Sequence, residues 1–237
     1  MRKIIREVAD ILFPRRCPFC DAVITAKEGI CAACRMKITY TDEPVCKRCG
    51  QPVADERQEY CYDCNRKTHV YHAGKAVFTY QGVVKQSLYR FKYANKREYA
   101  ICYGQEAVRL WGSWILARQI EAVIPIPLHR KRQRMRGYNQ AELFAREVGR
   151  NLHLPVRTDI VYRSVNTTPQ KNLDDQQRKK NLKKAFTISQ NIVQLKKVLL
   201  VDDIYTTGST VDAVAQCLKE AGVEEVYVLC ISIGRGY

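Results

Sequence analysis

The residues with the clearest chemistry are cysteines: eight of the eleven in this 237-residue chain form four Cys-x-x-C pairs between positions 17 and 64. Two intervening residues let a tight turn present both sulfurs to one metal ion, and two such turns complete a tetrahedral zinc site. The spacing therefore predicts two structural zinc ions. Their ligands would be Cys17, Cys20, Cys31, Cys34, Cys46, Cys49, Cys61 and Cys64.

Other uses of paired cysteines fit this pattern less well. Disulfide frameworks are typical of secreted proteins, whereas the stretch MRKIIREVADILF, interrupted by Glu7 and Asp10, predicts a short amphipathic helix rather than a signal peptide. A redox dithiol would need one pair, not four. The spacing permits pairing in sequence order or interleaved. His69 and His72 lie nearby, and we expect them to be loop residues because eight thiolates suffice for two ions.

A second candidate site is the stretch VLLVDDIYTTGST, residues 198–210, which joins an apolar run, two acids and a hydroxyl-rich helix start. Ligands of open parallel sheets bind beyond the C-terminal strand ends, and backbone N–H groups at a helix start form a phosphate cradle. Asp202 and Asp203 can accept hydrogen bonds from a ribose diol, and Gly208 allows close backbone approach. A plain helix N-cap with incidental acids is the simpler interpretation, but the complete unit favours a ligand site.

This stretch resembles the phosphoribosyl pyrophosphate (PRPP) signature of type I phosphoribosyltransferases. Three further features resemble the ComF competence family. They are the cysteine-rich N-terminus, the segment VIPIPLHRKRQRMRGYNQAELFA at 123–145, and the set Arg163, Pro169, Gln170, Leu173, Arg178, Asn181 and Phe186. The resemblance covers most of the chain, and its motifs occur in the expected order.

The resemblance implies that the acid pair binds the ribose hydroxyls of PRPP and that the next loop binds its 5′-phosphate, with Mg²⁺ accompanying the ligand. The implied PRPP-binding residues are Asp202, Asp203, Thr206, Thr207, Gly208, Ser209 and Thr210. It also implies a pyrophosphate loop at 127–136 and a mobile lid at about 163–184. Each candidate cation in these loops could equally be a solvated surface charge; they are Arg130, Lys131, Arg132, Lys171, Arg178 and Lys179.

The positive charge of the chain is concentrated in its middle. Residues 73–184 hold 23 basic and 8 acidic residues, a net charge of +15, which predicts a polyanionic partner: nucleic acid or a small phosphorylated compound. Within them, residues 85–136 hold 12 basic and 3 acidic residues, and Tyr89, Phe91 and Tyr93 alternate with cations. That pattern suits single-stranded DNA. The alternatives are an ordinary soluble surface and core roles for Phe91 and Tyr93.

The elements that must position these residues alternate between strands and helices. Apolar runs predict strands at 75–80, 121–126, 160–162, 185–188, 198–201 and 225–233. Helical patterns cover 82–92, 97–118, 139–152 and 210–221, and the basic run 129–137 is predicted as a loop. Such alternation implies a mainly parallel sheet flanked by helices. We therefore predict an α/β, type I phosphoribosyltransferase-like domain at 73–237, after an N-terminal helix and double zinc ribbon at 1–72.

The predicted function is that of a competence-associated protein that handles incoming single-stranded DNA and binds PRPP, with a DNA-uptake helicase as a further partner. The alternative is an active, Mg²⁺-dependent phosphoribosyltransferase with an unknown acceptor. The sequence assigns no base pocket and no catalytic residue, and a fold does not by itself establish turnover. No apolar run approaches the roughly 18–20 residues of a membrane span, and the expected location is the cytoplasm.

Overall fold

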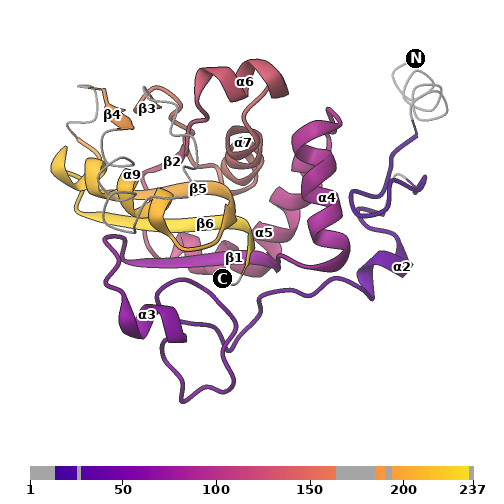
Figure 1. The fold of residues 1–237 in the computed structure, drawn as a ribbon, viewed down its shortest axis with the longest axis horizontal. Helices are drawn as coiled ribbons and strands as arrows, with labels where there is room; N and C mark the ends of the chain where they lie inside the picture. The colour runs from indigo at the N-terminus through magenta and orange to yellow at the C-terminus, as the bar shows by residue number, and fades with distance from the viewer. Residues whose placement is uncertain (1–13, 26–27, 164–184, 190–193, 235–237) are drawn as a thin grey trace, which may run out of the picture.

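The computed structural model describes residues 14–25, 28–163, 185–189 and 194–234. At its centre lies a four-stranded sheet in the order β1-β6-β5-β2, in which all neighbours are parallel (Figure 1). The strands are β1 (Ala73–Thr79), β2 (Ala122–Pro125), β5 (Lys197–Tyr205) and β6 (Glu225–Ile233). The predicted α/β architecture is confirmed.

Helices cover both faces of this sheet. On one face lie α4 (Gly82–Tyr93), α5 (Tyr99–Leu116) and α7 (Gln140–Leu152), and on the other lies α9 (Ser209–Glu220). The buried side chains of α5 recur at helical spacing, every fourth residue from Tyr99 to Ile115. No helix within the described residues is long and apolar enough to span a membrane.

The apolar run of β5 is explained by this two-sided cover. Side chains alternate along a strand, so Val198 and Leu200 join the core beneath α9 while Leu199 and Val201 join the core beneath α5 and α7. All four are fully buried. A strand covered on both faces must be apolar at every position, which is the pattern of residues 198–201.

The strand β5 is longer than predicted. Apolar residues stop at Val201, but the pairing with β6 continues from Asp202, opposite Cys230, to Tyr205, opposite Ile233. The two acids therefore lie in the last part of the strand rather than in the loop after it. Hydrophobicity marks only the part of a strand that is covered on both faces, so the end of β5, where Asp202, Asp203 and Ile204 are half-buried, was missed.

The basic run at 129–137 is not the loop that was predicted. Residues 130–136 form a helix, α6 (Arg130–Arg136), which begins after His129 and ends at Gly137, whose φ of 78° is left-handed. The ring nitrogen of His129 accepts the backbone N–H of Lys131, 3.2 Å away. The sequence concealed this helix because it buries none of its residues and so lacks an apolar face.

Two short strands lie outside the parallel sheet. β3 (Val161–Arg163) and β4 (Phe186–Ile188) pair with each other in antiparallel fashion. The predicted N-terminal helix at 1–13 lies outside the described residues, as do residues 164–184 of the predicted lid. The proposed boundary between 1–72 and 73–237 stays a prediction; β1 begins at Ala73.

Candidate functional site

The eight paired cysteines gather into two clusters, grouped in the sequence order that the spacing left open. The first cluster is Cys17, Cys20, Cys31 and Cys34, and the second cluster is Cys46, Cys49, Cys61 and Cys64. Within each, all sulfur atoms lie within 4.8 Å of one another. The sulfurs of Cys20 and Cys31 are 3.7 Å apart, and those of Cys49 and Cys61 are 3.6 Å apart.

Both clusters fit zinc. Four thiolates at about 2.3 Å from a tetrahedral ion lie about 3.8 Å from one another, close to the sulfur–sulfur distances observed. The cysteines are free rather than disulfide-bonded. Four thiolate ligands leave no open coordination position, so zinc bound here would supply cross-linking rather than catalysis.

The same local structure builds each cluster. The first Cys-x-x-C pair lies in a turn closed by a single β-bridge, which joins Arg16 to Val23 in one cluster and Val45 to Pro52 in the other. The second pair opens a helix of about one turn, α2 (Ala32–Arg35) or α3 (Tyr62–Arg66), with Cys31 or Cys61 as its N-cap residue. Residues three apart share one face of a helix, so the two sulfurs converge.

The acid pair lies at the C-terminal end of β5, where a cation from another element meets it. The Nζ of Lys92, on α4, lies 2.9 Å from Oδ2 of Asp203, and these side chains are only 16% and 14% exposed. Asp202 uses its Oδ1 to accept the backbone N–H of Asp203 at 2.8 Å. Lys92 therefore compensates one of two adjacent carboxylates. In the sequence, Lys92 is only one of the cations that alternate with aromatic residues, and nothing local to it indicates contact with Asp203.

The other acid of the pair, Asp202, has a raised pKa. Burial, together with the neighbouring Asp203 carboxylate, raises the pKa of Asp202 to about 7, although Lys92 and Arg163 act in the opposite direction. A carboxyl group with this pKa exchanges its proton near neutral pH. Any ligand that donates hydrogen bonds to Asp202, or brings a cation to it, would favour the ionised form.

The hydroxyl-rich loop joins this acid pair to α9. Gly208 begins the helix with a left-handed φ of 74°. A Cβ atom at Gly208 would collide with the hydroxyl of Tyr205 and lie 3.0 Å from Cε1 of His69, so only glycine fits this turn. The hydroxyls of Thr207 and Ser209 are 2.9 Å apart. The predicted residues of 202–210 thus occupy one strand end and one helix start, an arrangement suited to a phosphorylated ligand.

The predicted loop cations divide into three groups. Arg132 of α6 and Asp202 both act electrostatically on Arg163 of β3, where burial is the main cause of a lowered pKa. Arg163 thus lies near Asp202, and Arg132 lies near Arg163. Arg130 and Lys131 are exposed on α6. The remaining candidates lie outside the described residues; they are Lys171, Arg178 and Lys179.

Sequence reasoning also missed a histidine–carboxylate contact beside the loop. His69 is not a member of either cysteine cluster, as expected, but it is no ordinary loop residue. Its side chain is 2% exposed, and its Nδ1 lies 2.8 Å from Oδ2 of Asp212 in the first turn of α9. These residues are 143 positions apart, so no local pattern could have paired them.

An aromatic and basic surface lies on α4 and α6, which we call the α4–α6 surface. Tyr89 and Tyr93 are 66% and 54% exposed, and their ring centroids are 5.0 Å apart. The guanidinium of Arg136 lies 5.1 Å from the ring centroid of Tyr93. Phe91, by contrast, is completely buried. The core role considered for Phe91 is therefore correct, whereas the two tyrosines face solvent.

Comparisons with known proteins agree with this two-part organisation. Residues 8–65 match a double zinc ribbon domain, and residues 138–235 match a phosphoribosyl transferase domain. The chain is 32% identical over 235 residues to Competence protein F of Haemophilus influenzae, covering 91% of this chain and 96% of that protein. It is 30% identical to the DNA utilization protein YhgH of Escherichia coli, covering 86% and 89%. It is 28% identical to Competence protein ComFC of Bacillus subtilis, covering 82% and 80%.

The cluster geometry predicts the metal content of the purified protein. Elemental analysis should find about two zinc ions per chain, and Cys31→Ser and Cys61→Ser should each reduce the content to about one, because three thiolates hold zinc less tightly than four. Cys217→Ser, which lies outside both clusters, is the matched control and should keep the wild-type content. Full zinc in both cluster variants would contradict the assignment.

The raised pKa of Asp202 predicts that removing its charge stabilises the protein, by an amount that increases with pH. Folding favours the protonated carboxyl, so its stabilising contribution is present below the ordinary value of 3.8 and is lost as pH rises through about 7. Asp202→Asn removes this loss and keeps an acceptor for the N–H of Asp203. Urea unfolding of the ligand-free, zinc-loaded protein should show a stabilisation that is roughly 1 kcal/mol larger at pH 8 than at pH 6. Equal gains at both pH values would show that Asp202 is ionised throughout.

Proposed function

Because this chain belongs to the ComF family of competence proteins, we propose that it handles incoming single-stranded DNA and binds PRPP at the end of β5. The names of its relatives support a role in competence or DNA utilization. One observation carries the proposal: α4 places Lys92 on Asp203 and also exposes Tyr89 and Tyr93 to solvent. A single helix thus connects the candidate phosphoribosyl site with the candidate DNA surface.

PRPP with Mg²⁺ is the proposed small ligand. The carboxylates of Asp202 and Asp203 would accept the ribose hydroxyls, and residues 206–210 would receive the 5′-phosphate at the start of α9. Arg163 lies near Asp202, and Arg132 lies near Arg163; both would balance the pyrophosphate charge together with Mg²⁺. Lys92 already forms an ion pair with Asp203, so a cation lies beside this acceptor before the ligand binds.

Single-stranded DNA is the proposed macromolecular partner of the α4–α6 surface. Tyr89 and Tyr93 can stack bases, at about 1–3 kcal/mol per base. The exposed cations of α6, together with Lys85 and Arg97, can contact phosphates. Proteins that bind single strands without sequence preference combine these two features. A DNA-uptake helicase stays the expected protein partner, and free thiolates fit the proposed reducing cytoplasm.

A phosphoribosyltransferase reaction is the second candidate, favoured by the match of residues 138–235 to that domain. In such a reaction an acceptor attacks the anomeric carbon of PRPP, and the electrons of the broken C–O bond leave with pyrophosphate. In this proposal Arg132, Arg163 and residues 206–210 would supply the phosphate side of this chemistry. Release of pyrophosphate from PRPP in the presence of DNA or nucleobases would distinguish turnover from binding alone.

Removing the charge of the acid pair should abolish PRPP binding. The isosteric double variant Asp202→Asn/Asp203→Asn preserves shape but weakens both acceptors of the ribose diol, and each lost charged hydrogen bond costs roughly tenfold or more in affinity. Calorimetry with PRPP and Mg²⁺ should therefore detect no binding, while zinc content stays unchanged. The control is Glu142→Gln, which replaces a partly exposed acid on α7 that is paired with Arg146. Wild-type affinity in the double variant would refute the site.

The exposed tyrosine pair should be required for DNA binding. Tyr89→Ala/Tyr93→Ala should weaken binding of a labelled single-stranded oligonucleotide by about tenfold or more, because two stacking partners are lost. Binding by the wild type should also fall steeply with salt, since counterion release drives it. The control is Tyr62→Ala on α3, because Arg66 lies 5.0 Å from the Tyr62 ring centroid, much as Arg136 lies over Tyr93.

Fluorescence anisotropy across a salt series measures both effects. If PRPP displaces the oligonucleotide, the basic residues serve both ligands at overlapping positions. If the wild type shows no binding even at low salt, another protein must carry the DNA, and the DNA part of the proposal fails.

A further inference from the structure

The segment between the second cluster and β1 contacts the start of α9 through one carboxylate. Asp212 has both oxygens engaged: Oδ2 lies 2.8 Å from Nδ1 of His69, and Oδ1 accepts the backbone N–H of Val70 at 2.9 Å. Asp212 is in the first turn of α9, four residues after Gly208. Two hydrogen bonds to one rigid carboxylate fix the direction in which this helix begins, and therefore the position of the loop before it.

The same segment packs directly against residues 206–210, which we call the phosphate loop after the proposed ligand. The hydroxyls of Tyr71 and Tyr205 are 2.7 Å apart, and both side chains are buried. Cε1 of His69 would lie 3.0 Å from a Cβ atom at Gly208, so there is no free space between the histidine ring and the turn. His69 thus contacts the loop at Gly208, and Tyr71 contacts Tyr205, which precedes it.

The second cluster is joined to this segment on the other side. Arg48 lies between Cys46 and Cys49, and its guanidinium donates to the carbonyl of Tyr71 at 2.7 Å. The carbonyl of Arg48 accepts the N–H of Gly74 at 2.6 Å. The turn that contains Cys46 and Cys49 therefore contacts both ends of the segment 71–74.

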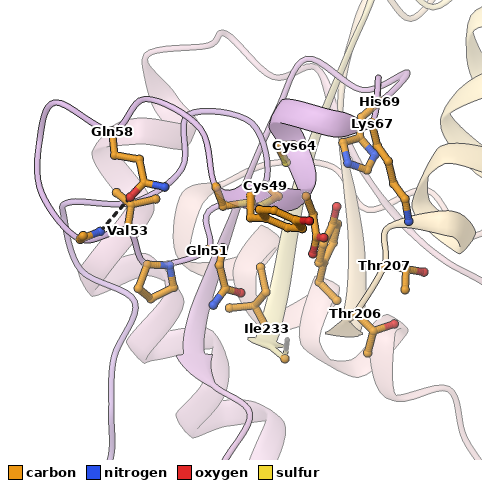
Figure 2. Close-up of a pocket in the computed structure, with 17 residues that line it drawn as sticks. Cys49, Gln51, Val53, Gln58, Cys64, Lys67, His69, Thr206, Thr207 and Ile233 are labelled. Carbon is orange, nitrogen blue, oxygen red and sulfur yellow. Dashed lines mark hydrogen bonds between the residues drawn. The ribbon is translucent and has the colours of Figure 1, made fainter. Parts of the chain in front are cut away.

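The second cluster and the phosphate loop also line one cavity of about 520 Å³. Its wall includes Cys49, Cys61 and Cys64 from the cluster, and Thr206 and Thr207 from the loop. Figure 2 shows His69 and Lys67 between these two groups, with the Lys67 side chain extending toward Thr207. The first cluster has a different position: Phe19 packs on Phe78 in the core that contains α4 and α5.

We propose that His69 is a positioning residue for the phosphate loop and that zinc in the second cluster is energetically coupled to ligand binding through it. This inference rests on the proposed phosphoribosyl site. Zinc bound by the second cluster would fix the turn around Arg48, and that turn holds residues 71–74. The adjoining residues His69 and Tyr71 contact Asp212, Gly208 and Tyr205. By linkage, a ligand that needs the ordered loop must in turn favour zinc retention in the second cluster.

Calorimetry with ribose 5-phosphate tests the positioning role, because this probe contains the 5′-phosphate without pyrophosphate. His69→Phe keeps an aromatic ring but removes the donor to Asp212, and it should weaken binding by about tenfold, the effect of one charged hydrogen bond. His69→Asn, which retains a donor, should restore most of the affinity. His72→Phe is the matched control, since His72 contacts Val226 rather than the loop, and it should bind as the wild type does. All variants should contain two zinc ions.

Zinc release to a colorimetric chelator tests the coupling and needs no variant. Ribose 5-phosphate should slow the loss of one of the two ions in the wild type, and this protection should disappear in His69→Phe. Unchanged affinity in His69→Phe, or a wild-type release rate that ignores the ligand, would overturn the coupling and leave the proposed function intact. Absence of wild-type binding to both PRPP and ribose 5-phosphate would instead overturn the proposed function.

Discussion

Two adjacent carboxylates at the end of a buried strand are the constraint to which the surrounding structure responds. Asp202 and Asp203 repel each other where water is partly excluded, and the raised pKa of Asp202 reflects this cost. Lys92 relieves part of it, but only if α4 is held at a fixed distance from β5. The first cluster provides that restraint. The guanidinium of Arg90 and the hydroxyl of Ser87, both on α4, donate to carbonyls at positions 19 and 18, within the turn between Cys17 and Cys20.

The two cysteine clusters therefore contact different parts of the candidate site. The first cluster joins the core under α4 and α5 and restrains the helix that carries Lys92, while the second joins the core under α9 and lies against the phosphate loop. Neither unit has a core of its own: α2 and α3 contain four and five residues. Zinc bound by the clusters would supply the folding free energy that so small a segment cannot obtain from burial. Residues of the double zinc ribbon therefore form part of the hydrophobic cores of the sheet domain.

Features set by short-range sequence could be predicted, and features set by long-range contacts could not. The cysteine pairs and the strand–acid–loop–helix unit each need residues within about a dozen positions, so the clusters and the loop were recognisable from spacing. Lys92 meets Asp203, and His69 meets Asp212, only through the tertiary fold, because the members of each pair are far apart in the sequence. Neither partner has a local signature. The helix α6 was missed for a different reason, since seven residues without a buried face carry no periodic signal.

Aromatic residues and cations alternate along α4, but the helix exposes some of these side chains and buries others. Positions 89 and 93 are four apart and share a face, whereas position 91 points away from both. Tyr89 and Tyr93 are accordingly exposed and Phe91 buried. The cations divide in the same way: Arg90 and Lys92 bind partners inside the molecule. The excess charge of residues 85–136 therefore overstates what is available to DNA phosphates. The part that faces outward is the α4–α6 surface, so the two tyrosines, rather than the total charge, define the candidate DNA footprint.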